Sequence, residues 1–166
     1  MKRTKPAGAT APTMMTARQL EVRYARGVDV PCTDTLRTSR ALADVLRPIM
    51  EGRVQEALIV LHLDARHRLI GWEETAKGAM NVVHVCPRDI FRSAIAVGAA
   101  VICVAHNHPS GDPTPSTDDV ALTNRLRTAA EIVGVPLIDH LILADEGFFS
   151  FTDGRITRLP RWTPTR

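Results

Sequence analysis

Apolar residues in this chain recur at two spacings, one typical of helices and one typical of strands. Residues 36–50 repeat apolar side chains every three or four positions, which is the spacing of one helix face. Ser39 lies near the expected start of this helix, and Pro48 is expected to kink or fray its end. Short apolar, partly β-branched runs predict strands. The segments expected to be strands are residues 56–63, 68–75, a stretch near 82–85, 99–105, 137–144 and 148–152.

Two further helices are expected between these strands. Pro87 suits the first position of a helix over residues 87–97, because that position leaves its amide unpaired, and Gly98 can end the helix. A second amphipathic segment starts at Ser116 and ends at Gly134. Helices that alternate with strands predict an α/β fold, in which a mixed β-sheet with flanking helices forms a single domain. The apolar positions expected in the second helix are Val120, Leu122, Leu126, Ala130 and Val133.

The run of residues 99–105 leads into a histidine motif, His106-Asn107-His108-Pro109-Ser110-Gly111. Residues two apart in an extended strand point to the same side, so the rings of His106 and His108 share one face. Proline and glycine stiffen the turn that follows, and Asp119 falls in the first turn of the next helix. Imidazole nitrogens and a carboxylate oxygen are ordinary zinc donors, and three protein ligands leave a fourth position for water. The spacing therefore predicts a metal site.

Each of these residues also has a structural interpretation. Ser116 and Asp119 have the spacing of a capping box, and an acidic residue in a first helical turn favours the helix dipole with or without a metal. A single histidine is more often a hydrogen-bonded residue than a ligand. Cys103 has the opposite parity to His106, so its side chain is expected to face away from the metal as a small core residue. The metal site is favoured by the combination of two histidines, a stiff turn and a carboxylate.

The pattern His106-x-His108, seven residues, Ser116, two residues and Asp119 resembles the signature of JAMM (MPN+) metalloproteases. The longer text His-Asn-His-Pro-Ser-Gly-Asp-Pro-x-Pro-Ser-x-x-Asp is similar to the RadC group within that family, over about residues 30–155. The resemblance implies that His106, His108 and Asp119 hold one zinc ion. It also implies that Ser116 supports the oxyanion or the bound water. Glu56 would be the general base and acid, although spacing alone leaves Glu51, Glu73, Glu74, Glu131 and Glu146 open as well.

The resemblance further implies a JAB/MPN (cytidine-deaminase-like) architecture and a function. The function would be that of a zinc-dependent metallohydrolase, a metallopeptidase or isopeptidase that cleaves a peptide or protein substrate with a metal-activated water. RadC-like proteins of full length carry an N-terminal helix-hairpin-helix region, whereas about 35 residues precede the first expected helix here. A short form without that DNA-binding element is therefore expected.

Other functions compete with hydrolysis. The RadC group has a historical link to DNA repair, so a noncatalytic DNA-binding module is the alternative. The net charge of +3 combines +5 in residues 1–26 and +4 in residues 155–166 with −6 in residues 27–154, so nucleic-acid contact is expected to be weak and confined to the basic ends. The letters His-Asn-His suggest a nuclease, but such nucleases disperse these residues over a ββα element. A zinc deaminase is disfavoured because His-x-Glu followed by Pro-Cys-x-x-Cys is missing.

The length and composition of the chain indicate its number of domains and its cellular location. With 166 residues, 45% of them hydrophobic, the chain can bury one core. We expect a disordered basic leader at residues 1–29, the RadC-like domain at 30–155 and a basic tail at 156–166. Three cysteines without a CxxC pair, and the lack of any signal-peptide or membrane-length apolar stretch, favour the cytoplasm and no membrane contact. The oligomeric state stays open. His67 is expected in a turn, and structural roles are expected for His62, His84 and His140.

Overall fold

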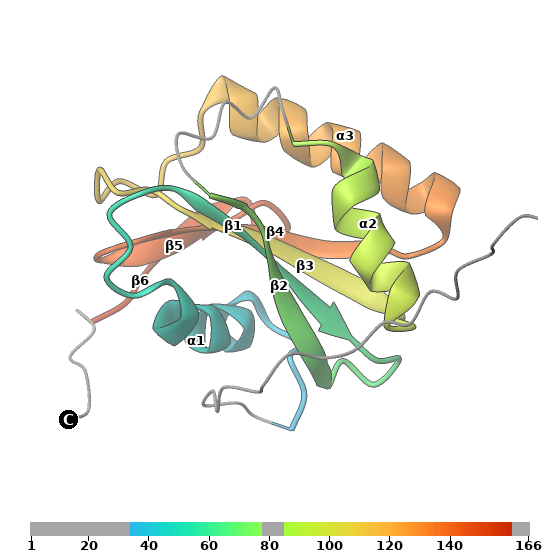
Figure 1. Cartoon of the computed structure of the whole chain (residues 1–166). Coiled ribbons are helices and arrows are strands. Elements are labelled where there is room, and N and C mark those ends of the chain that lie inside the picture. The colour runs from blue at the N-terminus through green and yellow to red at the C-terminus, as the bar shows by residue number, and fades with distance from the viewer. Residues whose placement is uncertain (1–33, 78–84, 161–166) are drawn as a thin grey trace, which may run out of the picture.

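The computed structural model describes residues 34–77 and 85–160, which form one mixed sheet with helices on both faces (Figure 1). The strand order is β2-β1-β3-β4-β5-β6; β3 and β4 run parallel, and all other neighbours run antiparallel. The architecture is therefore the expected α/β fold with a mixed sheet. The elements are α1 (Ser39–Met50), β1 (Ala57–Leu63), β2 (Leu69–Lys77), α2 (Pro87–Ala96), β3 (Val101–Asn107), α3 (Thr117–Val133), β4 (Leu137–Ala144), β5 (Gly147–Ser150) and β6 (Arg155–Arg158).

The two faces of the sheet carry separate hydrophobic cores. α1 covers one face, where the buried residues include Leu46 and Cys103. α2 and α3 cover the opposite face, where the buried residues include Leu126 and Val104. Adjacent residues of β3 thus point into different cores. This confirms that Cys103 faces away from the side of the sheet on which His106 lies.

The helices α1 and α2 lie close to their expected bounds. Thr38 rather than Ser39 caps α1, because its side chain accepts a backbone hydrogen bond at the start of the helix. The helix continues past Pro48 for two residues. Pro87 occupies the first turn of α2, as expected. None of the helices within the described residues is long and apolar enough to cross a membrane.

The third helix departs from its apolar pattern. Its bounds agree with the expected ones, since Ser116 caps the start and Gly134 adopts the left-handed conformation at the end, with a φ of 76°. Val120 and Val133 are 43% and 38% exposed, so these two expected core positions were wrong. The buried face carries two polar residues that hydrophobic spacing cannot reveal. The buried residues of α3 are Asp119, Leu122, Thr123, Leu126 and Ala130.

The strands required one correction, at the C-terminal boundary. Residues 156–166 were expected to be a basic tail, but β6 pairs with β5 and extends the sheet to Arg158. This strand is largely exposed and lacks a clear apolar alternation, so its main-chain pairing left no signal in the sequence. His67 lies in the turn between β1 and β2 with a φ of 62°, which confirms its expected place. The strand expected near 82–85 falls almost wholly outside the described residues.

The topology brings three segments to one end of the sheet. Leu58 lies opposite His106 in the antiparallel pair of β1 and β3, so the start of β1 neighbours the end of β3. α3 then forms the crossover from β3 to the parallel strand β4, with its N-terminus near the same end. The histidine motif, the residues before β1 and the first turn of α3 therefore meet.

Candidate metal centre

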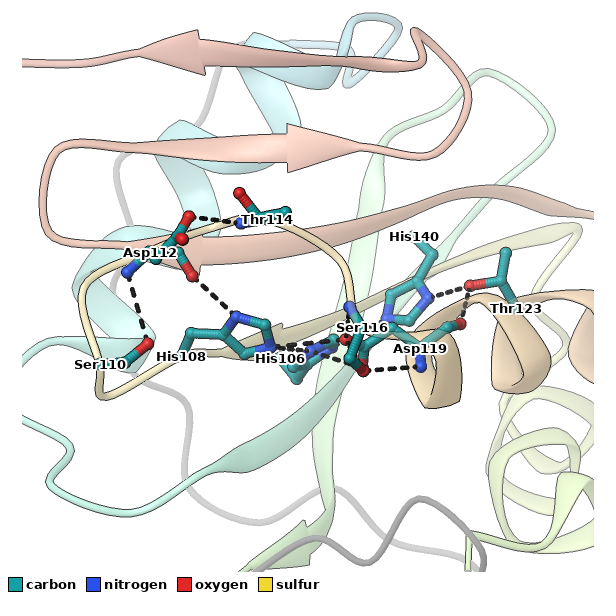
Figure 2. Close-up of polar contacts among 9 residues, drawn as sticks. All are labelled: His106, His108, Ser110, Asp112, Thr114, Ser116, Asp119, Thr123 and His140. Atoms are coloured by element: carbon teal, nitrogen blue, oxygen red, sulfur yellow. Dashed lines mark hydrogen bonds and ion pairs between the residues drawn. The ribbon is translucent and has the colours of Figure 1, made fainter.

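The end of β3 and the first turn of α3 place three metal-ligating side chains together. His106 Nε2 lies 3.1 Å from His108 Nε2 and 3.1 Å from Asp119 Oδ1. His108 Nε2 lies 3.6 Å from Asp119 Oδ2. Figure 2 shows both rings and the carboxylate converging from strand and helix. All three candidate ligand atoms lie within 4.8 Å of one another, so the expected set can hold a metal ion.

Ser116 holds Asp119 in this position. Its main-chain amide and its hydroxyl both donate to Asp119 Oδ2, at 2.8 and 2.6 Å, and its Oγ accepts the Asp119 amide at 3.1 Å. The capping box expected from the sequence is therefore complete. The hydroxyl hydrogen of Ser116 is thus directed to Asp119. Support of an oxyanion would require the hydroxyl of Ser116 to rotate away from the carboxylate.

Glu56 lies at the edge of the same site. It immediately precedes β1 and is partly buried. The register that sets Leu58 opposite His106 sets Glu56 opposite His108 when it is continued by two residues. Glu56 also shares the parity of Leu58, whose core lies on the α2 and α3 face of the sheet. The pKa of His108 is raised chiefly by its hydrogen bond with Asp119, and the charge of Glu56 adds to the rise, as expected for a carboxylate close to that ring.

The Nδ1 atom of His108 forms a hydrogen bond with the main chain. His108 Nδ1 lies 2.8 Å from the carbonyl oxygen of Asp112, which can only accept a hydrogen bond. Nδ1 therefore carries a hydrogen, and in the neutral ring Nε2 carries a lone pair. The side chain of Asp112 stabilises this loop, because its Oδ1 accepts the Thr114 amide at 2.9 Å (Figure 2). The stiff loop thus points the lone pair of His108 toward Asp119.

Two buried residues, Thr123 and His140, determine that the Nδ1 atom of His106 carries the ring hydrogen. Thr123 Oγ1 lies 2.6 Å from the Asp119 carbonyl oxygen and 2.6 Å from His140 Nδ1. The hydroxyl has one hydrogen and the carbonyl can only accept it, so His140 Nδ1 must donate to Thr123. His140 Nε2 then accepts from His106 Nδ1 at 2.9 Å. The lone pair of His106 is consequently left on Nε2, on the side of Asp119 (Figure 2).

This donor set fits a metal ion. The hydrogen-bond partners leave two imidazole lone pairs and a carboxylate facing one another in a buried space. Such an arrangement attracts a cation, and imidazole nitrogens with a carboxylate oxygen are zinc ligands. Burial raises the pKa of Asp119, but the contacts with His106, His108 and Ser116 outweigh burial and hold the pKa well below its usual range. Asp119 is therefore ionised at neutral pH and available as a ligand.

The sequence of this chain matches a family of known proteins, and the fold and the site are consistent with that family. The family model described as "RadC-like JAB domain" matches residues 36–156, which is well over half of the chain. The chain belongs to the RadC-like JAB domain family. The match includes the whole histidine motif and Asp119, and it starts within three residues of α1. The resemblance read from the sequence is thus confirmed.

Curated relatives of this JAB domain carry names that state no activity. A "UPF0758 protein" of Clostridium perfringens is 46% identical over 99 residues, which cover 60% of this chain and 44% of the relative. A UPF0758 protein of Paraburkholderia xenovorans is 44% identical over 116 residues, or 70% of this chain and 46% of the relative. One from Aquifex aeolicus is 46% identical over 119 residues, 72% of this chain and 51% of the relative. The chain spans about half the length of these relatives.

His140 corrects one expectation about this JAB domain. It was expected to have a structural role, but its ring contacts the metal-ligand candidate His106 directly. The ring is 0% exposed and stacks on Phe151, with centroids 5.0 Å apart. Burial lowers the pKa of His140 well below its ordinary value, so the ring is neutral and can accept from His106. The sequence signal would have been its parity with Ile142 on β4, a strand that pairs with β3.

The other expected structural histidines behave differently. His62 Nε2 lies 3.0 Å from Ser93 Oγ on α2, away from the metal centre, so its expected role is confirmed. His84 lies outside the described residues. The sequence gives no sign that Thr123 belongs to the site, because a threonine on a helix does not indicate its partner. Only the packing of α3 on β4 brings Thr123 to His140.

Removal of the Thr123 hydroxyl is expected to weaken metal binding. In Thr123→Val, His140 Nδ1 loses its buried acceptor, so the hydrogen of His140 can move to Nε2 and force His106 to carry its own hydrogen on the metal-facing nitrogen. Substitution of a residue that orients a metal ligand by hydrogen bonding typically lowers metal affinity by about 10- to 100-fold. Competition with a chromophoric zinc chelator measures the affinity. Thr128→Val is the matched control, because Thr128 on the same helix also donates to a carbonyl four residues earlier but contacts no histidine. Equal affinities in the two variants would contradict the assignment.

A cleft opens beside the metal centre. Its volume is about 550 Å³, and Asn107 and His108 form part of its wall. Residues 50–54, which follow α1, and residues 143–145, at the end of β4, form much of the rest. The His108 side chain is 15% exposed, whereas those of His106 and Asp119 are at most 3% exposed. The site is thus closed on the side of α3 and reached from the side of His108.

Proposed function

We propose that this RadC-like JAB domain is a zinc-dependent metallohydrolase that cleaves peptide or isopeptide bonds. The observation that carries the proposal is the convergence of His106, His108 and Asp119, with the Glu56 carboxylate near His108. A structural zinc site is closed by four protein ligands, whereas a catalytic site has three and keeps an open position. Among the described residues the cluster has three candidate ligands, which favours catalysis.

The proposed mechanism assigns a role to each residue of the candidate site. Zinc, when bound, lowers the pKa of a water ligand toward about 7 and polarises the attacked carbonyl. His106, His108 and Asp119 would hold the ion, with Ser116 orienting the Asp119 carboxylate. Glu56 would accept the proton of the attacking water and return it to the leaving amine.

The cleft suits an extended substrate segment. Both polar and apolar residues line it, and the apolar ones include Met50, Val54 and Leu143. Val54 is 87% exposed at this end of the molecule, so an apolar substrate side chain would bury it on binding. We expect the substrate to be a peptide or protein segment whose scissile bond reaches His108 and Glu56.

The alternative of a noncatalytic DNA-binding module stays a prediction. The basic residues that would contact nucleic acid lie mainly in residues 1–26 and 161–166, outside the described part of the chain. Arg155 and Arg158 on β6 are exposed, but two cations alone do not identify a nucleic-acid surface. The cluster at the end of β3 has no role in that alternative, whereas hydrolysis uses every member of it.

The experiment that tests the proposal is a screen for zinc-dependent cleavage. The protein is stripped of metal with a chelator, divided, and one half is restored with zinc. Both halves are incubated with a library of peptides and lysine-linked isopeptides, and the products are identified by mass spectrometry. We expect cleavage only in the restored half. A fully zinc-loaded protein that cleaves nothing in either library would contradict hydrolysis while leaving metal binding intact.

A further inference from the structure

The side chain of Asn107 holds the backbone on both sides of Glu56. Asn107 Oδ1 accepts the Ala57 amide at 2.8 Å, and Asn107 Nδ2 donates to the Gln55 carbonyl at 3.1 Å. A main-chain amide can only donate and a carbonyl can only accept, so the orientation of the Asn107 amide is unambiguous. One side chain thus binds the residue before Glu56 and the residue after it, across 50 positions of sequence.

These two hydrogen bonds replace main-chain pairing where the sheet ends. The register between β1 and β3 stops at Leu58 opposite His106. The next step in that register would set Ala57 opposite Asn107, and there the Asn107 side chain supplies the acceptor and the donor instead of its backbone. Asn107 is 7% exposed, so solvent competes little for either bond. The segment that carries Glu56 is therefore attached to β3 beyond the last paired residue.

Asn107 lies between the two histidines but on the other side of the strand. His106 and His108 point to the face covered by α2 and α3, and Asn107 has the opposite parity. It therefore contributes no ligand atom to the cluster of His106, His108 and Asp119. Because it is adjacent in sequence to both histidines, any movement of the end of β3 moves the ligands and the Glu56 backbone together.

We propose that Asn107 is a positioning residue, which sets the Glu56 carboxylate at a fixed place relative to the metal ligands. The inference rests on the proposed function for its kinetic consequence, since Glu56 is the general base only if the domain is a hydrolase. The positioning itself requires no turnover. Asn107 acts through the Gln55–Ala57 backbone and not as a metal ligand.

Two variants separate the two hydrogen bonds. Asn107→Ala removes both, whereas Asn107→Asp keeps an acceptor for the Ala57 amide and loses the donor to Gln55. The matched control is Asn124→Ala, because Asn124 is exposed on α3. Zinc stoichiometry and thermal unfolding are measured first, and we expect all three variants to fold and bind zinc like the wild type.

The structural readout is amide hydrogen exchange in the zinc-loaded protein. We expect the Ala57 amide to exchange about 10-fold faster in Asn107→Ala, and to keep much of its protection in Asn107→Asp. The amides of Val60 and Val104, in the paired part of β1 and β3, should be unchanged. In cobalt-loaded protein, the paramagnetic shift of the Glu56 amide should also change in Asn107→Ala. Unchanged exchange at Ala57 and an unchanged Glu56 shift would overturn the proposal.

The kinetic readout is a double-mutant cycle with Glu56→Gln. In the wild-type background, Asn107→Ala is expected to lower kcat by about 100-fold with little change in KM, because a displaced general base loses its geometry. In the Glu56→Gln background, the same change is expected to lower kcat by less than about twofold. An equal loss in both backgrounds would overturn the assignment. If the wild type hydrolyses nothing, the proposed function fails, while the exchange and cobalt measurements still decide whether Asn107 positions Glu56.

Discussion

Replacing His106 and His108 together with alanine is expected to remove zinc binding completely. Each imidazole presents its Nε2 lone pair to the same buried space, because Asp112 and His140 occupy the two Nδ1 atoms. A site with one carboxylate left has too few donors for zinc, which takes four ligands. Metal analysis of purified protein should therefore fall from about one equivalent per chain to the level of a blank.

The same variant should lose the stabilisation that zinc provides. A ligand that binds only the folded state at 100 times its Kd adds about 2.7 kcal/mol. For a domain of this size, that corresponds to a rise in Tm of about 5–10 °C in differential scanning fluorimetry. The wild type should show the rise on adding zinc, and the double variant should show none.

His62→Ala is the matched control for the loss of a histidine. His62 is also buried, at 3% exposed, and lies on the same face of the sheet, but it contacts Ser93 rather than the metal centre. This variant should lose stability through its cavity and keep its zinc. Zinc retained in the double variant, or lost from His62→Ala alone, would show that the ion binds elsewhere.

Glu56→Gln is expected to abolish most hydrolysis and to leave zinc bound. The amide has the shape of the carboxylate but cannot accept a proton from the attacking water. General acid–base catalysis of this kind contributes about 10²- to 10⁴-fold, or about 3–5 kcal/mol in the activation barrier. We expect kcat to fall by that factor, measured on the substrate found in the screen, with zinc stoichiometry unchanged.

Glu51→Gln provides the comparison for Glu56→Gln. Glu51 is an exposed carboxylate five residues earlier in the chain, and it lines the cleft beside the metal centre. Its substitution also removes one negative charge from this end of the domain without changing a candidate ligand, so kcat should change by less than about twofold if general-base chemistry is what matters. Full activity in Glu56→Gln would remove Glu56 from the mechanism and make another group the base. Equal losses in the two variants would indicate that negative charge near the site, rather than proton transfer, supports turnover.

Local features of the site were predictable because they depend on neighbours in sequence. The parity of a strand placed His106 and His108 on one face, and it turned Cys103 to the other. The three-residue spacing of Ser116 and Asp119 predicted the capping box, which the structure contains. These are consequences of backbone geometry within one element or across one helix start.

Other features depend on pairs of residues that are far apart in the chain. His140 contacts His106 across 34 positions, and Asn107 contacts Ala57 across 50. No periodicity within a strand or helix encodes such a pair. The apolar pattern of α3 failed at Val120 and Val133, which are exposed, whereas the polar residues Asp119 and Thr123 near the start of the helix are buried.

The amino-acid sequence by itself determined the candidate ligand set, the α/β fold and the order of most helices and strands. Hydrophobic spacing, turn residues and caps act over a few positions, and a chain carries them wherever it folds. Only the tertiary structure decided which groups surround the ligands. The antiparallel pairing of β1 with β3 brought Glu56 beside His108, and the packing of α3 on β4 joined Thr123 to His140. Those contacts arise when separate elements share one buried space, and that space exists only in the folded sheet.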